Sequence, residues 1–446
     1  MLPTIPYVAI ITTMTRNQLI IIGVGGFFVL IFFLMLVGVL PGFRKQEPTA
    51  VQATLTMWGV GRDSGQFDGA LAQFKNSYPN ISVKYRGFDS LDTYESALLE
   101  AFASGKSPDI FMVANESFPR FANKIIPFST TAMPLSQLEQ LFPQTVEETF
   151  VQNGQVYALP LSIDTLALIY NKDMLSAAGI PVPPATWEDF KAEIPSLLKK
   201  DKKTGNITIA ASSIGGSEAN TKNAADLLSA LMIQTGTKMV DPSFSNATFS
   251  SEEGRNALAF YTQFANPDSA SYTWNASMPY SIDAFSQEKV AMTFGYLSDV
   301  NDIKSKNSFL NFGVAPLPQP SSAVKASTHP FYYGLAVSIQ TKQNDAAKRL
   351  ILGITTDPVA AASYLDAAKQ PPALLSLVDR NVNDPIMNVF SKQILFARSW
   401  PKPDDRTVTQ IFSRMIDNAV SKKLSVYDSL QQGASEVNTV FQQKSL

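Results

Sequence analysis

Strand and helix patterns alternate along residues 53–113, and this alternation restricts the fold class more than any other feature of the chain. Period-two strand patterns lie at residues 53–58, 81–85 and 109–113, and helical spacing of apolar residues lies at 67–78 and 94–102. The order β-α-β-α-β predicts a mostly parallel sheet that is covered by helices on both faces, which is an α/β fold.

In parallel sheets of this kind, ligands bind in the loops that follow the carboxyl ends of the strands. The loop after the first predicted strand carries Trp58, Arg62 and Asp63, and the loop after the third carries Asn115 and Glu116. Flat aromatic faces can stack on a ligand, and ionised or amide oxygens accept strong hydrogen bonds from its donor groups. These five residues are therefore predicted to face a ligand.

Length and composition exclude several classes of function. The chain has 446 residues, too many for one core, with 36 basic and 38 acidic side chains, so nothing indicates a nucleic-acid partner. Cysteine is absent and histidine occurs once, at His329. Thiol nucleophiles, disulfides and Cys/His zinc sites are therefore excluded, and hydrolytic chemistry would depend on carboxylates.

Residues Leu19–Leu40 form an uncharged apolar run that ends at Pro41-Gly42. Its length matches a hydrocarbon core of about 30 Å, and it exceeds the 7–15 apolar residues usual in a signal peptide. We predict one N-terminal transmembrane helix. A cleaved signal peptide is the alternative, and Met14 is an alternative start of the chain.

Residues 157–190 carry three signals in a fixed order. An apolar, β-rich run ends at Asn171-Lys172-Asp173, a proline-rich link follows at Pro181–Pro184, and Thr186 opens a helix. This segment resembles the hinge of the extracellular solute-binding proteins of bacterial ABC importers, family 1, the carbohydrate-type branch that is similar to maltose-binding protein. Phe285–Thr293 resembles another segment of the family, although Glu288 stands where the family usually has glycine.

The resemblance implies a two-lobed periplasmic-binding-protein type II (Venus flytrap) fold, preceded here by one transmembrane helix. Hinge crossings are expected at Pro160–Thr165 and Ala315–Pro318. The expected organisation is a short N-terminal segment at 1–18, an anchor at 19–40, a linker at 41–52, a first lobe at 53–163 plus 318–374, and a second lobe at 164–317 plus 375–446.

The resemblance also places further ligand-binding residues. Asp164 lies at the first hinge crossing, where the family often has an acidic ligand-binding residue. Tyr296 stands where the family has an aromatic residue in the cleft, and Tyr333 lies on the strand after the second crossing. Trp400, in the segment that returns to the second lobe, and Trp274 complete the predicted site.

The function that follows is a membrane-tethered, extracytoplasmic solute-binding protein that feeds ABC transporter permease subunits with a sugar, an oligosaccharide or another small polar solute. We expect a monomer with its binding domain outside the cell membrane, which binds ligand without a cofactor or a metal and has no nucleic-acid partner. Two alternatives stay open: a surface-anchored, carboxylate-dependent glycoside hydrolase, and a sensory ectodomain that presents ligand to a partner.

Overall fold

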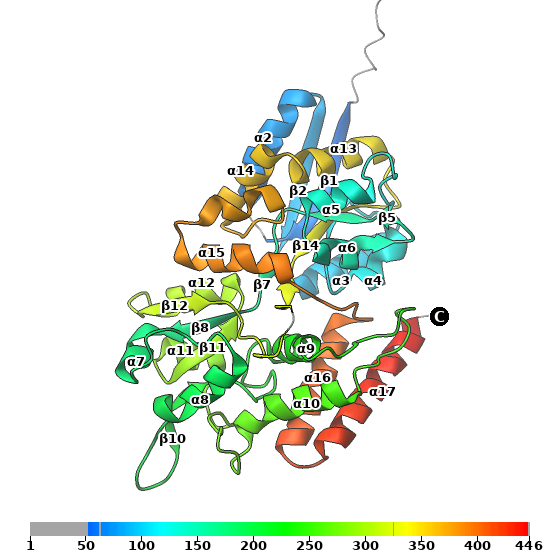
Figure 1. The fold of residues 1–446 in the computed structure, drawn as a ribbon. Coiled ribbons are helices and arrows are strands. Elements are labelled where there is room, and N and C mark those ends of the chain that lie inside the picture. Colours follow the sequence, from blue (N-terminus) through cyan, green and yellow to red (C-terminus); the bar gives the residue numbers. More distant parts are fainter. Residues whose placement is uncertain (1–51, 62–63, 324, 445–446) are drawn as a thin grey trace, which may run out of the picture. The chain divides into compact units, whose positions relative to one another are not determined.

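The computed structural model describes residues 52–61, 64–323 and 325–444. They contain two five-stranded sheets with separate apolar cores, and we call the parts around these sheets the first lobe and the second lobe (Figure 1). Across these stretches no helix has the length and apolar character needed to span a membrane. The predicted span Leu19–Leu40 lies outside the described residues.

The sheet of the first lobe has the strand order β2-β1-β3-β14-β6. Its first three strands are parallel, as the alternating pattern predicts, whereas β14 runs antiparallel to both of its neighbours. The strands are β1 (Ala53–Val60), β2 (Ile81–Phe88), β3 (Ile110–Ala114), β6 (Ala158–Pro160) and β14 (Tyr333–Val337). The helices are α2 (Asp68–Ser77), α3 (Leu91–Ala103), α4 (Phe118–Phe121), α5 (Leu135–Leu141), α6 (Gln144–Phe150), α13 (Asn344–Thr355) and α14 (Pro358–Ala368).

The sheet of the second lobe has the order β12-β8-β11-β10-β9 and is mixed rather than parallel, because β8 runs antiparallel to both β11 and β12. Its strands are β8 (Ala167–Asn171), β9 (Lys199–Lys200), β10 (Ile207–Ser212), β11 (Val290–Gly295) and β12 (Phe312–Ala315). The helices are α7 (Lys172–Ala177), α8 (Trp187–Leu197), α9 (Ala224–Gln234), α10 (Glu252–Thr262), α11 (Ser281–Ser286), α12 (Leu297–Lys306), α15 (Pro385–Gln393), α16 (Asp405–Val420) and α17 (Val426–Lys444).

Local sequence signals explain where several of these elements begin. The hydroxyl group of Thr186 accepts a hydrogen bond from the backbone N–H of Asp189, which is the predicted N-cap of α8. Glu288, in the turn between α11 and β11, has φ +57°. Glycine adopts this left-handed conformation without strain, which gives a physical reason for glycine at this position in the family.

The chain crosses between the two sheets twice near the centre of the molecule. The first crossing links β6 to β8, and the second links β12 to β14. Each contributes a two-residue strand, β7 (Asp164–Thr165) and β13 (Pro330–Phe331), and the two strands pair with Asp164 opposite Phe331. This short ribbon is the hinge. The second crossing is longer than the predicted Ala315–Pro318, because strand pairing with the first lobe starts again only at Tyr333.

The close packing of β14 gives a direct test of the first-lobe core. A Cβ atom on Gly334 would lie 2.7 Å from the Cβ of Ala158 and 2.7 Å from a ring carbon of Phe150. We therefore expect Gly334→Ala to lower the free energy of unfolding by about 1–3 kcal/mol, as overpacking of a filled core does. Urea unfolding followed by circular dichroism measures this change.

Gly433→Ala is the control. It lies on α17, where the new Cβ would meet the flexible end of Met415 and alanine favours the helix by about 1 kcal/mol. Equal stability of the two variants would contradict the close contact at Gly334.

Candidate functional site between the lobes

A buried lysine links the two lobes. Lys402, in the segment ahead of α16, is 1% exposed, and its Nζ lies 2.6 Å from Glu116 Oε1, 2.9 Å from Asp405 Oδ1 and 3.4 Å from Asp226 Oδ1. Glu116 follows β3 of the first lobe, whereas Asp226 and Asp405 lie in the first turns of α9 and α16 of the second. We call these four residues the Lys402 cluster.

The ammonium group of Lys402 is buried, and a buried charge is stable only when it is paired with an opposite charge. Burial alone would lower the pKa of Lys402, but the carboxylates of Asp405, Glu116 and Asp226 outweigh it and hold that pKa well above its usual value. Burial raises the pKa of Glu116 well above its usual range, and Asp405 adds to the effect. For Asp226, burial opposes ionisation, but Lys402 lowers the pKa below its usual value. Lys402 is therefore a permanent cation with Asp226 as its ionised partner.

Tyr296, His329 and Asp164 form hydrogen bonds between the Lys402 cluster and the hinge. The hydroxyl group of Tyr296 donates to Asp226 Oδ2 at 2.9 Å and lies 3.2 Å from Nδ1 of His329. Burial lowers the pKa of His329 to about 4, so its imidazole is neutral at pH 7. Asp164 accepts hydrogen bonds from the backbone N–H groups of Leu297 and Thr165, and burial raises its pKa to about 7. Asp164 thus ties the hinge ribbon to the start of α12.

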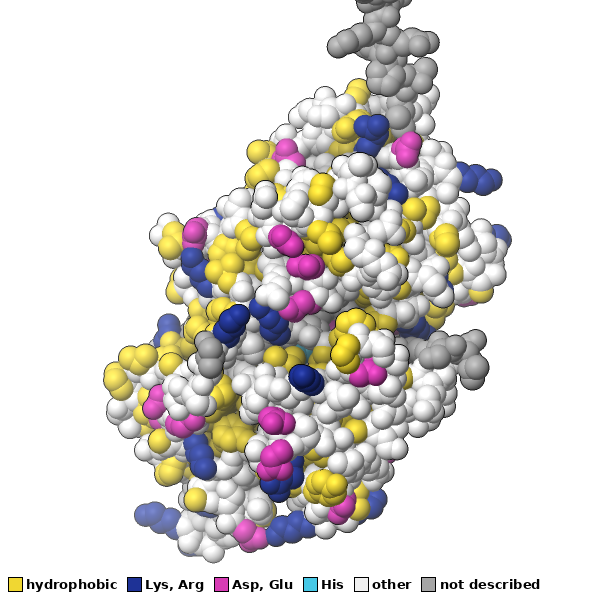
Figure 2. All heavy atoms as spheres, turned by 45° about the vertical axis from the view of Figure 1, so that its right-hand side comes forward, with side chains coloured by type: hydrophobic (Ala, Val, Ile, Leu, Met, Phe, Trp, Pro, Cys, Tyr) yellow, Lys and Arg dark blue, Asp and Glu magenta, His cyan; other side chains and the backbone are white. Residues whose placement is uncertain are grey.

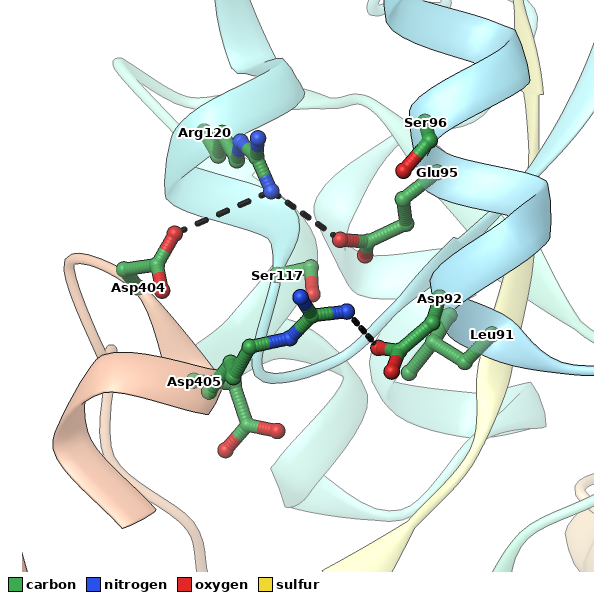
Figure 3. Close-up of a pocket in the computed structure, with 9 residues that line it drawn as sticks. Leu91, Asp92, Glu95, Ser96, Ser117, Arg120, Asp404 and Asp405 are labelled. Carbon is green, nitrogen blue, oxygen red and sulfur yellow. Dashed lines mark hydrogen bonds and ion pairs between the residues drawn. The ribbon is translucent and has the colours of Figure 1, made fainter. Parts of the chain in front are cut away.

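Three hollows surround this cluster, and each is lined by residues of both lobes. The hollow in Figure 3 has a volume of about 160 Å³ and lies between α3 and the start of α16. Arg120 reaches Glu95 at 3.1 Å within the first lobe and Asp404 at 3.7 Å in the second, and Arg406 pairs with Asp92. Figure 2 shows acidic and basic side chains next to each other at the level where the lobes meet.

A second hollow, of about 260 Å³, lies at the starts of α9 and α12, where Glu218 and Lys222 face Glu116 of the first lobe. A third, of about 80 Å³, is lined by aromatic side chains that include Phe118 and Trp400, with Asn115 at its edge. The first two hollows are rich in donors and acceptors on helices and strands, whereas the lining of the third is mainly apolar. Such a cleft can bind a solute that carries many hydroxyl groups.

A metal ion does not fit the most obvious group of ligand atoms. Among the described residues, Glu116, Asp226 and His329 could each offer one atom, with all three atoms within 4.8 Å of one another. The ammonium group of Lys402 already fills the space beside them, at 2.6 Å from Glu116 and 3.4 Å from Asp226. The same ammonium group separates the two carboxylates, so they do not flank an open space in which a glycosidic bond could be cleaved.

Four of the residues predicted from sequence line these hollows: Glu116, Tyr296, Asn115 and Trp400. Asn115 lies at the junction of the lobes, where its side chain donates to the carbonyl oxygen of Pro330 and accepts from the N–H of Tyr332. Tyr333 lies next to the hinge, with its ring 5.3 Å from that of Phe331.

The predicted tryptophans have different surroundings. Trp58 is half-buried on the first lobe beneath the guanidinium group of Arg86, at 4.5 Å, and lines none of the three hollows described above. Trp400 lines the third hollow but is 4% exposed and donates a hydrogen bond to Ser229. Trp274 is fully buried in the core of the second lobe. Arg62 and Asp63 lie outside the described residues.

Lys402, Asp226 and Asp405 are not among the residues predicted from the sequence. One signal was available, because the run Trp400–Asp405 places a lysine between two prolines and directly ahead of two carboxylates. Nothing in the sequence pairs this run with Glu116 or with the start of α9, because both lie far away along the chain.

Two discontinuous α/β lobes joined by a hinge, with a polar cleft between them, are the architecture of a protein that encloses a small solute. The family model for bacterial extracellular solute-binding proteins matches residues 60–358. Because this match covers more than half of the chain, the chain belongs to that family.

Individual relatives agree with this assignment. A maltotriose-binding protein of Pyrococcus abyssi is 24% identical over 345 residues, which are 75% of this chain and 70% of the relative. The cyclic α-maltosyl-1,6-maltose binding protein of Arthrobacter globiformis has a TM-score of 0.74 at 19% identity and covers 88% of this chain and 100% of its own. The sugar-binding protein MalE of Xanthomonas citri has a TM-score of 0.73 at 20% identity, with 88% and 98% covered. At these identities the structures establish the fold alone.

Removal of the buried cation tests the Lys402 cluster. We expect Lys402→Met to lower the free energy of unfolding by about 3–5 kcal/mol, because it leaves buried carboxylates without a counter-charge. Chemical unfolding monitored by tryptophan fluorescence measures the loss.

The matched control is Lys422→Met, because Lys422 pairs with Asp268 and both side chains are exposed. Such surface pairs contribute about 0–1 kcal/mol. If the two variants were equally stable, the cluster would not be a buried ionic network.

Proposed function

We propose that this solute-binding protein captures a neutral sugar or oligosaccharide between its lobes and delivers it to the permease of an ABC importer. The observation that carries the proposal is the convergence of ionised and hydroxyl-bearing side chains from both lobes around three hollows. Sugar hydroxyl groups donate to carboxylates and accept from ammonium and guanidinium groups, and both kinds of partner line the cleft. The names of the relatives, which include maltotriose- and maltose-type binding proteins, favour the same class of ligand.

The proposed mechanism is closure about the hinge ribbon. Glu116 and Arg120 come from the first lobe, whereas Asp226, Asp404 and Tyr296 come from the second, so a ligand that contacts both sets stabilises the closed form. A ligand shifts the equilibrium only by its difference in affinity for the open and closed forms. The permease would then distinguish the closed form from the open one.

Among the residues predicted from sequence, we propose that Glu116 and Tyr296 contact the ligand directly, because both line the second hollow. Asp164 would act by holding the start of α12 in place through its bond to Leu297. We propose lobe boundaries near residues 163, 317 and 374, as expected from sequence. The passage of the chain from β6 to β8 and from β12 to β14 supports the first two.

We further propose that the protein is tethered to the cell membrane by Leu19–Leu40, as a monomer with its binding domain on the extracytoplasmic side. The support is the uncharged run of residues, whose length fits a hydrocarbon core. A tether keeps the binding domain near its permease without a lipid anchor, for which the chain has no cysteine.

Ligand-induced closure is testable in solution. Protein that starts at Ala53 should decrease in radius of gyration when a saturating sugar is added, because the lobes approach one another. Its melting temperature should rise, since ligand at 100 times its Kd stabilises the native state by about 2.7 kcal/mol. Small-angle scattering and differential scanning fluorimetry across mono-, di- and trisaccharides measure both effects.

A sugar that raises the melting temperature without compaction would contradict closure. A panel in which no sugar raises the melting temperature would contradict the proposed ligand class.

The tether makes a separate prediction. Protein extracted from membranes with detergent should retain Leu19–Leu40, and the intact mass should include it. A mature N-terminus near residue 43, found in the soluble fraction, would instead establish a cleaved signal peptide.

A further inference from the structure

The second hollow has a lining of unusual composition. Its volume of about 260 Å³ is close to the lower end of the ~300–1,000 Å³ typical of small-molecule pockets, so it suits a single ring. Among the residues that line it, one side chain has no polar atom, and that side chain is Phe331. The others include Glu218, Lys222 and Asn223 before α9 and Ser298 on α12. Phe331 and the ring of Tyr296 are the aromatic side chains of this lining, and the other residues supply donors and acceptors. A pyranose has both kinds of surface, an apolar C–H face and a rim of hydroxyl groups.

The hinge holds Phe331 in a fixed orientation. Phe331 belongs to β13, where it pairs with Asp164 of β7. Its ring centroid lies 5.3 Å from that of Tyr333 at an interplanar angle of 80°, and 6.1 Å from that of Tyr296 at 56°. Phe331 is half-buried, so these contacts cover part of the ring and leave part of it at the hollow.

The charges around the hollow restrict the ligand further. Carboxyl groups outnumber cations there, and the available cations are already engaged. Lys222 lies 2.5 Å from Asp299 Oδ1, and Lys402 is bound by its three carboxylates. An added carboxylate or phosphate would therefore find no cation in the lining that lacks a carboxylate partner.

We propose that Phe331 is the stacking platform for one neutral pyranose ring in this hollow and is a specificity-determining residue of the protein. This inference rests on the proposed function and adds to it a position for one ring and the exclusion of acidic sugars. Phe331 belongs to the β7–β13 ribbon, which is the hinge. A sugar ring that stacks on Phe331 therefore contacts the hinge directly.

The test compares Phe331→Leu with Phe331→Tyr by isothermal titration calorimetry, with glucose, maltose, maltotriose and glucuronate as probes. Leucine removes the flat face but keeps apolar volume, so we expect the affinity for the sugar bound by the wild type to fall roughly 10- to 100-fold. Tyrosine keeps the face, so Phe331→Tyr should stay within about threefold of the wild type. Glucuronate should bind at least about tenfold more weakly than glucose, because Lys222, the cation among the residues that line the hollow, is already paired with Asp299 and leaves the added carboxylate without a counter-charge.

Phe312→Leu is the matched control, because Phe312 is also a half-buried aromatic residue at the edge of a strand but packs against Phe285 and lines none of the three hollows. Its affinity should equal that of the wild type. The melting temperature of each variant, measured by circular dichroism, shows whether a loss of affinity is due to a loss of folding.

Three failures are distinguishable. If the wild type binds none of the neutral sugars, the proposed function itself fails. If the wild type binds a neutral sugar but Phe331→Leu binds it equally well, or Phe331→Tyr loses as much affinity as Phe331→Leu, the platform is overturned. Glucuronate that binds as tightly as glucose would overturn the exclusion of acidic sugars.

Discussion

The ammonium group of Lys402 is the contact on which the arrangement of the cleft depends. A fully buried charge is tolerated only when it is paired, and this lysine takes its partners from both lobes. Once Lys402 is placed, the start of α9, the start of α16 and the loop after β3 must meet at one point. Tyr296 and His329 then complete the hydrogen bonding around the same point.

The cleft combines this rigid ionic centre with a short hinge. The ribbon of β7 and β13 contains only two residues on each side, and both Asp164 and Phe331 belong to it. Asp164 fixes the start of α12, and Phe331 lies against Tyr296 of the second lobe and Tyr333 of the first. If Phe331 binds the ligand as proposed, the ribbon that joins the lobes would also contact the ligand, and ligand binding would be coupled to closure.

The sequence predicted the parts of this structure that depend on local patterns. Alternation at residues 53–58 gave β1, the Thr186 cap gave the start of α8, and the first crossing at Pro160–Thr165 lies where the resemblance places it. The second crossing was predicted too short, because the return to the first sheet is set by pairing of β14 and not by the proline-rich segment.

The candidate site was less predictable. Glu116 was predicted from loop position and Tyr296 from the family resemblance, and both line the second hollow. Asp226 and Lys402 lie 176 residues apart, and their pairing depends on the packing of two helices that no local pattern encodes. Trp274 was predicted to bind ligand, but it is fully buried in the core. The sequence alone does not show whether an aromatic side chain packs in a core or lines a binding site.

The position of β14 has a consequence for how the polypeptide is made. This strand lies between β3 and β6, and within the described sheet β6 has no other partner. The ribosome must therefore synthesise residue 337 before the first sheet can be completed, although most of its strands emerge more than 170 residues earlier. During that interval the nascent chain lacks a closed first-lobe core, because the strands that complete it are far apart in sequence. The first lobe is therefore expected to finish folding only late in synthesis.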